Sequence, residues 1–187
     1  IIYSVNVSSS GEVSVSTNLS AEGAARISAR YTMLQQANDV DSVQRLFSQM
    51  ADYETDRLKA FLSGWNALEI LIAKAFNAYE RVFLSPLTNA GQPTLRERFL
   101  SRIKDVMKDK YRLTDKFVAV AAVIFPAVPD AEVQEDCKKF RRLKDLRDDI
   151  FHGEDFSEKD LPVDELATLL RKYVLAHIET PNQPGLG

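Results

Sequence analysis

The segment from Arg147 to Gly153, Arg-Asp-Asp-Ile-Phe-His-Gly, carries the side chains best suited to acid–base chemistry in this chain. His152 is one of two histidines, and histidine is the side chain that exchanges protons most readily near neutral pH. Arg147 has a permanent charge and a planar fork of donors that matches the oxygens of a phosphate. These two residue types at this spacing are therefore candidates for binding a phosphate and moving a proton beside it.

The sequence around this segment predicts a helix that delivers both side chains at its end. Arg147 lies four residues after Leu143 and three before Ile150, so it interrupts an apolar stripe that faces the core. A guanidinium directed toward a core needs a partner or a function. Gly153 favours a left-handed helix end, which places His152 at the terminus. The stripe over residues 130–151 consists of Val133, Cys137, Phe140, Leu143 and Ile150.

The most apolar helical pattern lies earlier, in the second half of residues 41–83, with an interruption near Asp52. We interpret it as the central core helix, and Trp65 as a core residue. Glu69 follows Trp65 by four residues and interrupts this apolar face, as Arg147 interrupts the later one. An interior ion pair between Glu69 and Arg147 is thus the structural alternative to a catalytic role, and the two do not exclude each other. Asn66 is assigned to the same face, as a second orienting residue.

The remaining segments predict an all-α bundle of five to six helices with a short N-terminal β-hairpin. Residues 1–18 alternate in polarity around a turn, so they read as a hairpin or the remnant of an upstream domain. The helical domain is expected over residues 19–180, followed by a flexible tail over 181–187. Helices are expected near residues 20–37, 94–110, 115–125 and 162–178, and the second of these should turn Leu95 and Phe99 inward.

Composition narrows the classes of partner. The net charge of −3 over 187 residues gives no overall signal for nucleic acid, so an RNA partner would need a local patch. Three basic residues near the motif are candidates for such a patch: Lys144, Arg141 and Lys138. The alternative is that they belong to a solvated helix face. No His/Cys group has metal-ligand spacing, so we expect no metal and no cofactor. Apolar runs are too short for a membrane and no signal peptide is evident, which predicts a cytoplasmic protein.

Three segments together resemble the HEPN superfamily of nucleotide-binding helical domains. They are WNALEILIAKAF (65–76), LKDLRDDIFHGE (143–154) and LATLLRKYVLAHI (166–178). The family motif is Arg, four to six residues, then His, with a polar residue directly after the Arg. Arg147, Asp148 and His152 match it, and the resemblance covers residues 58–178. It is nearest to the Abi-like and Apea-like branches, which have antiphage and toxin associations. Arg171 and His177 also have a permitted spacing, but they lie in a plain amphipathic helix, and we interpret them as a coincidence.

The resemblance implies a homodimer through the motif helices and a metal-independent endoribonuclease whose composite site uses the ribose 2′-hydroxyl as nucleophile. His152 would be the general acid or base, Arg147 the phosphate clamp and Asp148 an orienting group. An upstream sensor domain or an antitoxin is a further implied partner; a nucleotidyltransferase antitoxin is disfavoured because Glu154 replaces the tyrosine typical of that pairing. The alternative is a catalytically silent HEPN module for dimerisation or for nucleotide or RNA binding within a larger sensor.

Overall fold

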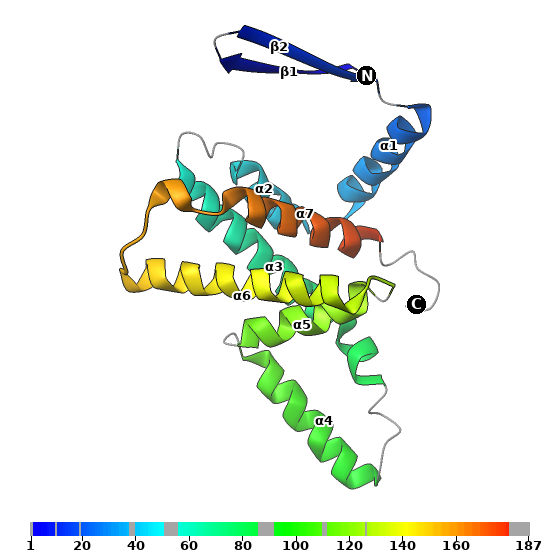
Figure 1. The fold of residues 1–187 in the computed structure, drawn as a ribbon. Helices are drawn as coiled ribbons and strands as arrows, with labels where there is room; N and C mark the ends of the chain where they lie inside the picture. The colour runs from blue at the N-terminus through cyan, green and yellow to red at the C-terminus, as the bar shows by residue number, and fades with distance from the viewer. Residues whose placement is uncertain are drawn as a thin grey trace. The chain divides into compact units, whose positions relative to one another are not determined.

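The computed structural model describes residues 2–9, 11–18, 20–37, 40–50, 56–85, 92–109, 112–125 and 127–179 (Figure 1). Contacts divide the chain into two compact units, Ile1–Asn38 and Asp39–Gly187. The first unit holds strands β1 (Ile2–Ser9) and β2 (Gly11–Asn18) and helix α1 (Ala21–Gln36). The sequence pattern predicts a helical domain that begins at residue 19, whereas the contacts group α1 with the strands and place the boundary after Asn38.

Within the first unit, β1 and β2 pair as antiparallel strands with Val5 opposite Val15. An isolated two-stranded hairpin is only marginally stable in water, so the hairpin remains a prediction. Helix α1 begins as its sequence predicts. The Ser20 hydroxyl oxygen accepts a hydrogen bond from the backbone N–H of Gly23 at 3.1 Å, which satisfies one of the free donors of the first turn.

The described residues of the second unit form helices joined by loops, which confirms the all-α class. The elements are α2 (Asp41–Gln49), α3 (Arg57–Leu84), α4 (Pro93–Lys108), α5 (Leu113–Ile124), α6 (Asp130–His152), the 3₁₀ helix η5 (Glu158–Asp160) and α7 (Val163–Glu179). The interruption expected near residue 52 falls between α2 and α3, outside the described residues. The Asp56 side chain caps α3 by accepting from the N–H of Lys59 at 2.8 Å.

Helix α3 is the central element of this unit, as its apolar pattern predicts, and it packs against α2, α5 and α7 (Figure 1). An aromatic cluster joins the helices around it. The Phe140 ring of α6 stacks on Phe117 of α5 with centroids 4.1 Å apart, and lies 5.3 Å from Trp65 of α3. Phe117 lies 4.8 Å from Tyr173 of α7. The four rings are nearly inaccessible to solvent, so they hold the helices that carry the motif in fixed positions.

Helix α6 is also joined to α7 by charged groups. Lys172 Nζ lies 2.7 Å from Asp136 Oδ2 and 2.9 Å from Glu132 Oε1, and Arg142 pairs with Glu165. Asp136 is only 5% exposed, and the sequence pattern had not identified it as buried. A buried carboxylate needs such a partner, because unpaired charge is costly away from water. These ion pairs link α6 to α7.

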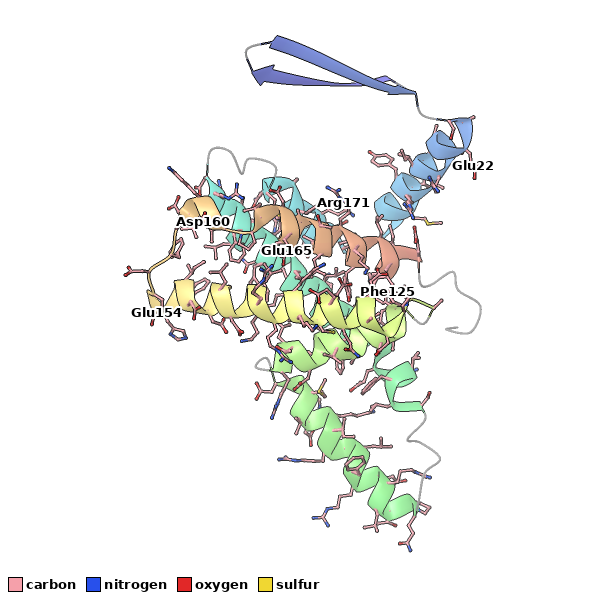
Figure 2. All side chains as sticks on the ribbon, in the orientation of Figure 1. Glu22, Phe125, Glu154, Asp160, Glu165 and Arg171 are labelled. Carbon is pink, nitrogen blue, oxygen red and sulfur yellow. The ribbon has the colours of Figure 1, made fainter. Side chains whose placement is uncertain are left out.

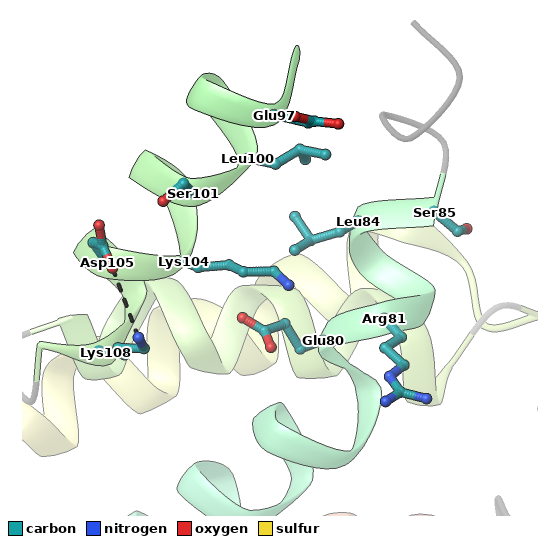
Figure 3. Close-up of a pocket in the computed structure, with 10 residues that line it drawn as sticks. All are labelled: Glu80, Arg81, Leu84, Ser85, Glu97, Leu100, Ser101, Lys104, Asp105 and Lys108. Carbon is teal, nitrogen blue, oxygen red and sulfur yellow. Dashed lines mark ion pairs between the residues drawn. The ribbon is translucent and has the colours of Figure 1, made fainter. Parts of the chain in front are cut away.

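The prediction that α4 buries Leu95 and Phe99 is wrong. These side chains are 62% and 58% exposed, and no described residue of α4 is buried. Where α4 approaches the end of α3, Leu100 faces Leu84 across a cavity of about 580 Å³ (Figure 3). Amphipathic spacing predicts that a helix has an apolar face, but it does not say whether another element covers that face.

Candidate functional site

Side chains from three helices line one cavity of about 480 Å³ in the second unit. Helix α6 supplies most of them, including the motif residues, and α3 and α5 supply the others. The lining residues are Trp65, Glu69, Leu113, Lys144, Arg147, Asp148 and His152. The structure therefore brings together the arginine, the histidine and the acid of the motif, the acid expected from α3, and one of the three basic residues named as RNA-binding candidates.

The end of α6 determines where His152 lies. Gly153 adopts the left-handed conformation with φ 79°, which a glycine reaches without strain. The N–H of Gly153 donates to the carbonyl of Ile150 at 3.2 Å, and the N–H of Glu154 donates to the carbonyl of Asp149 at 3.0 Å. This is the Schellman arrangement, and it satisfies carbonyls that the helix leaves open. It makes His152 the last helical residue, exposed to solvent at the cavity edge.

Arg147 is half-buried, and its guanidinium has three neighbours. Nη1 donates to Asp148 Oδ1 at 2.8 Å, Nη2 lies 3.9 Å from Glu69 Oε2, and the guanidinium carbon lies 4.5 Å from the Phe151 ring centroid. The ion pair predicted with Glu69 is thus present at long range, while Asp148 makes the closer contact. Stacking on Phe151 fixes the plane of the guanidinium and leaves donors free to meet a ligand.

Asp148 lies between two cations. Lys144 Nζ donates to Asp148 Oδ2 at 2.5 Å, while Arg147 donates to the other carboxylate oxygen. Burial by itself raises the pKa of Asp148, but the hydrogen bonds from Lys144 and Arg147 and their positive charges outweigh it, so this pKa lies below its ordinary value. Asp148 therefore stays ionised at neutral pH and can orient both cations.

The lowered pKa of Asp148 predicts a pH dependence of stability. A carboxyl group with a depressed folded pKa stabilises the protein above its unfolded pKa of about 3.9, and this stabilisation is lost as pH falls through the folded pKa. We expect Asp148→Asn to lower the free energy of unfolding by up to about 1 kcal/mol at pH 7, and the difference from wild type to disappear as pH falls through the folded pKa of Asp148. Urea unfolding across this range measures both; a difference independent of pH would contradict the assignment.

The other predicted site residues lie elsewhere. Asn66 is exposed and does not line the cavity, so the structure does not bring it to the motif. Arg141 and Lys138 line a separate cavity of about 400 Å³ along α6, together with Asp145. Only Lys144 of the three basic candidates reaches the motif, because it lies one helical turn before Arg147 and Asp148 while the other two point to a different face.

The second Arg–His pair in the sequence has a structural role. His177 is 6% exposed, and its Nδ1 lies 2.9 Å from the hydroxyl of Tyr79 on α3, within hydrogen-bonding distance. Arg171 is exposed on α7 (Figure 2). The two side chains therefore face opposite environments, which agrees with our interpretation of their spacing as a coincidence.

Trp65 and Leu113 are the cavity residues that sequence reasoning missed. Trp65 is 1% exposed and packs on Phe140, as expected of a core residue, yet it also lines the cavity beside Glu69. Its position four residues before Glu69 on a helix was the available signal, since residues at that spacing share a face. Leu113, the first residue of α5, completes the apolar part of the wall.

Among the described residues, no group of three or more His, Cys, Asp or Glu side chains is arranged to hold a metal ion. In the same part of the chain, no helix is both long and apolar enough to cross a membrane. No protein-family model, no curated protein and no solved structure matches this chain, so its function is argued from the cavity and the motif themselves.

Proposed function

We propose that this protein is a metal-independent endoribonuclease of the HEPN type, acting in the cytoplasm in antiphage defence or as a toxin. The observation that carries the proposal is that Arg147, His152 and Lys144 line one cavity. Cleavage of a phosphodiester needs a group that transfers protons and positive charge close to the phosphate, because negative charge grows on the phosphate oxygens while protons move. The motif resemblance supplies the class of reaction.

In this reaction the ribose 2′-oxygen forms a bond to phosphorus, and the bond from phosphorus to the 5′-oxygen breaks. The 2′-hydroxyl loses a proton to a base, and the leaving 5′-oxygen gains one from an acid. The products carry a 2′,3′-cyclic phosphate and a 5′-hydroxyl. Arg147 and Lys144 place fixed positive charge beside the phosphate, which reduces the need for a metal ion as the stabilising charge.

The two proton transfers support a composite site in a homodimer. His152 is the one histidine that lines the described cavity, while Glu69 and Asp148 are already engaged with Arg147. A second His152 from another copy of the chain would supply the second proton carrier. His152 is exposed at the end of α6, and the neighbouring Phe151 is 64% exposed, which is the kind of aromatic anchor that subunit interfaces bury.

Replacing Phe151 with serine is expected to convert the dimer into a monomer, because the apolar anchor beside His152 is lost. RNA cleavage should fall as well, both because the second copy is absent and because Arg147 loses the ring on which it stacks. Light scattering after size exclusion measures the mass. Phe99→Ser on α4 is the matched control, since this side chain is similarly exposed at 58% and should leave the dimer intact. A wild-type monomer that cleaves RNA would contradict the composite site.

A catalytically silent module that binds nucleotide or RNA within a larger sensor is the second candidate, and one contact favours it. The Asp148 carboxylate already accepts hydrogen bonds from Arg147 Nη1 at 2.8 Å and from Lys144 Nζ at 2.5 Å. An incoming phosphate must therefore compete with this carboxylate for the two cations. Such a module would retain the dimer and bind RNA without cutting it. An upstream sensor domain or an antitoxin would then act through this binding.

Cleavage of mixed structured and single-stranded RNAs in EDTA tests the proposed function. Wild-type protein should cleave, and Arg147→Ala should lose about 10²–10³-fold in rate, as expected when one donor to a developing oxyanion is removed. Arg141→Ala is the matched control, because it removes the same charge from the same helix at a separate cavity. RNA binding without cleavage by a folded dimer would favour the silent module. Equal losses in both variants would indicate a general charge effect.

A further inference from the structure

Two hydrogen-bond donors beside the cavity lack partners. Among the described residues, the buried nitrogen atoms Trp65 Nε1 and Arg147 Nε have no hydrogen-bond partner. Both residues line the same cavity, although neither nitrogen atom is itself accessible to solvent. Folded proteins seldom leave buried donors unpaired, because such groups have lost their water and gained nothing in exchange.

The chemistry of these donors defines what can satisfy them. An indole N–H and a guanidinium N–H donate and never accept, so the group that fills this part of the cavity must accept hydrogen bonds. Lys144 and Arg147 contribute two positive charges to the lining and Glu69 and Asp148 contribute two negative ones, so an anion binds here by displacing Asp148 from the two cations. The cavity of about 480 Å³ is much larger than the space of one water molecule, about 30 Å³. A tetrahedral oxyanion with several acceptor oxygens fits the unpaired donors and the size of the cavity.

We infer that the indole N–H of Trp65 is a direct donor to the oxyanion that Arg147 binds, which makes Trp65 a binding residue as well as a core residue. The inference rests on the proposed function in that this oxyanion is the phosphate of an RNA backbone. Trp65 is held 5.3 Å from Phe140, so its N–H is fixed before the ligand arrives. The phosphate then bridges two helices, with a neutral donor from α3 and charged donors from α6.

Trp65 is the only tryptophan in the chain, so its fluorescence reports directly on the cavity. The first experiment titrates wild-type protein with inorganic phosphate and, separately, with a short 2′-O-methyl RNA, which presents phosphodiesters but has no nucleophile to be cut. Saturable changes in emission are expected with the RNA analogue at lower concentration than with inorganic phosphate. Arg147→Ala should abolish the change, and Arg141→Ala should retain it. An unchanged emission at saturating ligand would overturn the inference.

The second experiment removes the N–H alone. Trp65→Phe keeps an aromatic ring against Phe140, and benzothienylalanine at this position keeps the full shape with sulfur in place of the N–H group. Both should bind the 2′-O-methyl RNA about tenfold more weakly than wild type in calorimetry, with circular dichroism unchanged. Full affinity in the isosteric variant would overturn the role of Trp65, and cleavage activity that persists in it would leave the proposed function intact. Conversely, wild-type protein that binds RNA without cleaving it would contradict the proposed ribonuclease activity and would leave the oxyanion site intact.

Discussion

Replacing His152 with alanine is expected to lower the rate of RNA cleavage by about 10²–10⁴-fold, because the proposed reaction loses the group that carries a proton to or from the ribose and the leaving oxygen. The fold should be unaffected, since His152 is exposed and the cap of α6 is made by backbone groups of Gly153 and Glu154. Gel analysis of a labelled RNA in EDTA measures the rate, and circular dichroism monitors the helix content.

The control for this variant is Glu154→Gln, which changes an exposed charge two residues away without touching the cavity lining. It should cleave RNA at close to the wild-type rate, or somewhat faster if the negative charge repels the substrate. A His152→Ala variant that cleaves as fast as wild type would remove His152 from the mechanism, whatever the behaviour of Arg147.

The largest effect on stability is expected at Phe140. Phe140→Ala should lower the free energy of unfolding by about 3–5 kcal/mol, because the side chain is completely buried between Phe117 and Trp65 and its removal leaves a cavity. Chemical unfolding followed by circular dichroism gives this value. Phe99→Ala removes the same group from an exposed position on α4 and should cost about 0.5 kcal/mol or less. Similar losses in the two variants would mean that the aromatic cluster does not hold the second unit together.

The sequence predicted the elements that carry the motif because strong local signals mark their ends. Asp130 and Gly153 bracket α6 as expected, since an acidic first turn and a left-handed glycine are chemical requirements of those positions. The interruption of an apolar stripe by Arg147 predicts that the guanidinium is directed inward, and in the structure Arg147 lines the cavity. Glu69 interrupts the apolar face of α3 in the same way, and this similarity predicts that the two side chains meet. In the structure both line the same cavity.

What the sequence did not predict depends on contacts between elements. Leu95 and Phe99 occupy core-like positions on α4, but their helix lacks a described partner over that face. Asn66 directly follows Trp65 in sequence, and one residue along a helix turns the side chain by about 100°, which leaves Asn66 in solvent. Trp65 was assigned to the core alone, because its unpaired N–H becomes visible only when the neighbouring atoms are in place.

The chemistry at the ends of the RNA products tests the central claim most directly. If the 2′-hydroxyl is the nucleophile, wild-type protein in EDTA should produce fragments with 2′,3′-cyclic phosphate and 5′-hydroxyl termini. It should also fail to cut a site whose ribose carries 2′-O-methyl, and His152→Ala should form the same products at a rate lowered by about 10²–10⁴-fold. Mass spectrometry of the fragments reads both termini. Fragments with 5′-phosphate ends, or cleavage at the blocked ribose, would contradict the proposed mechanism.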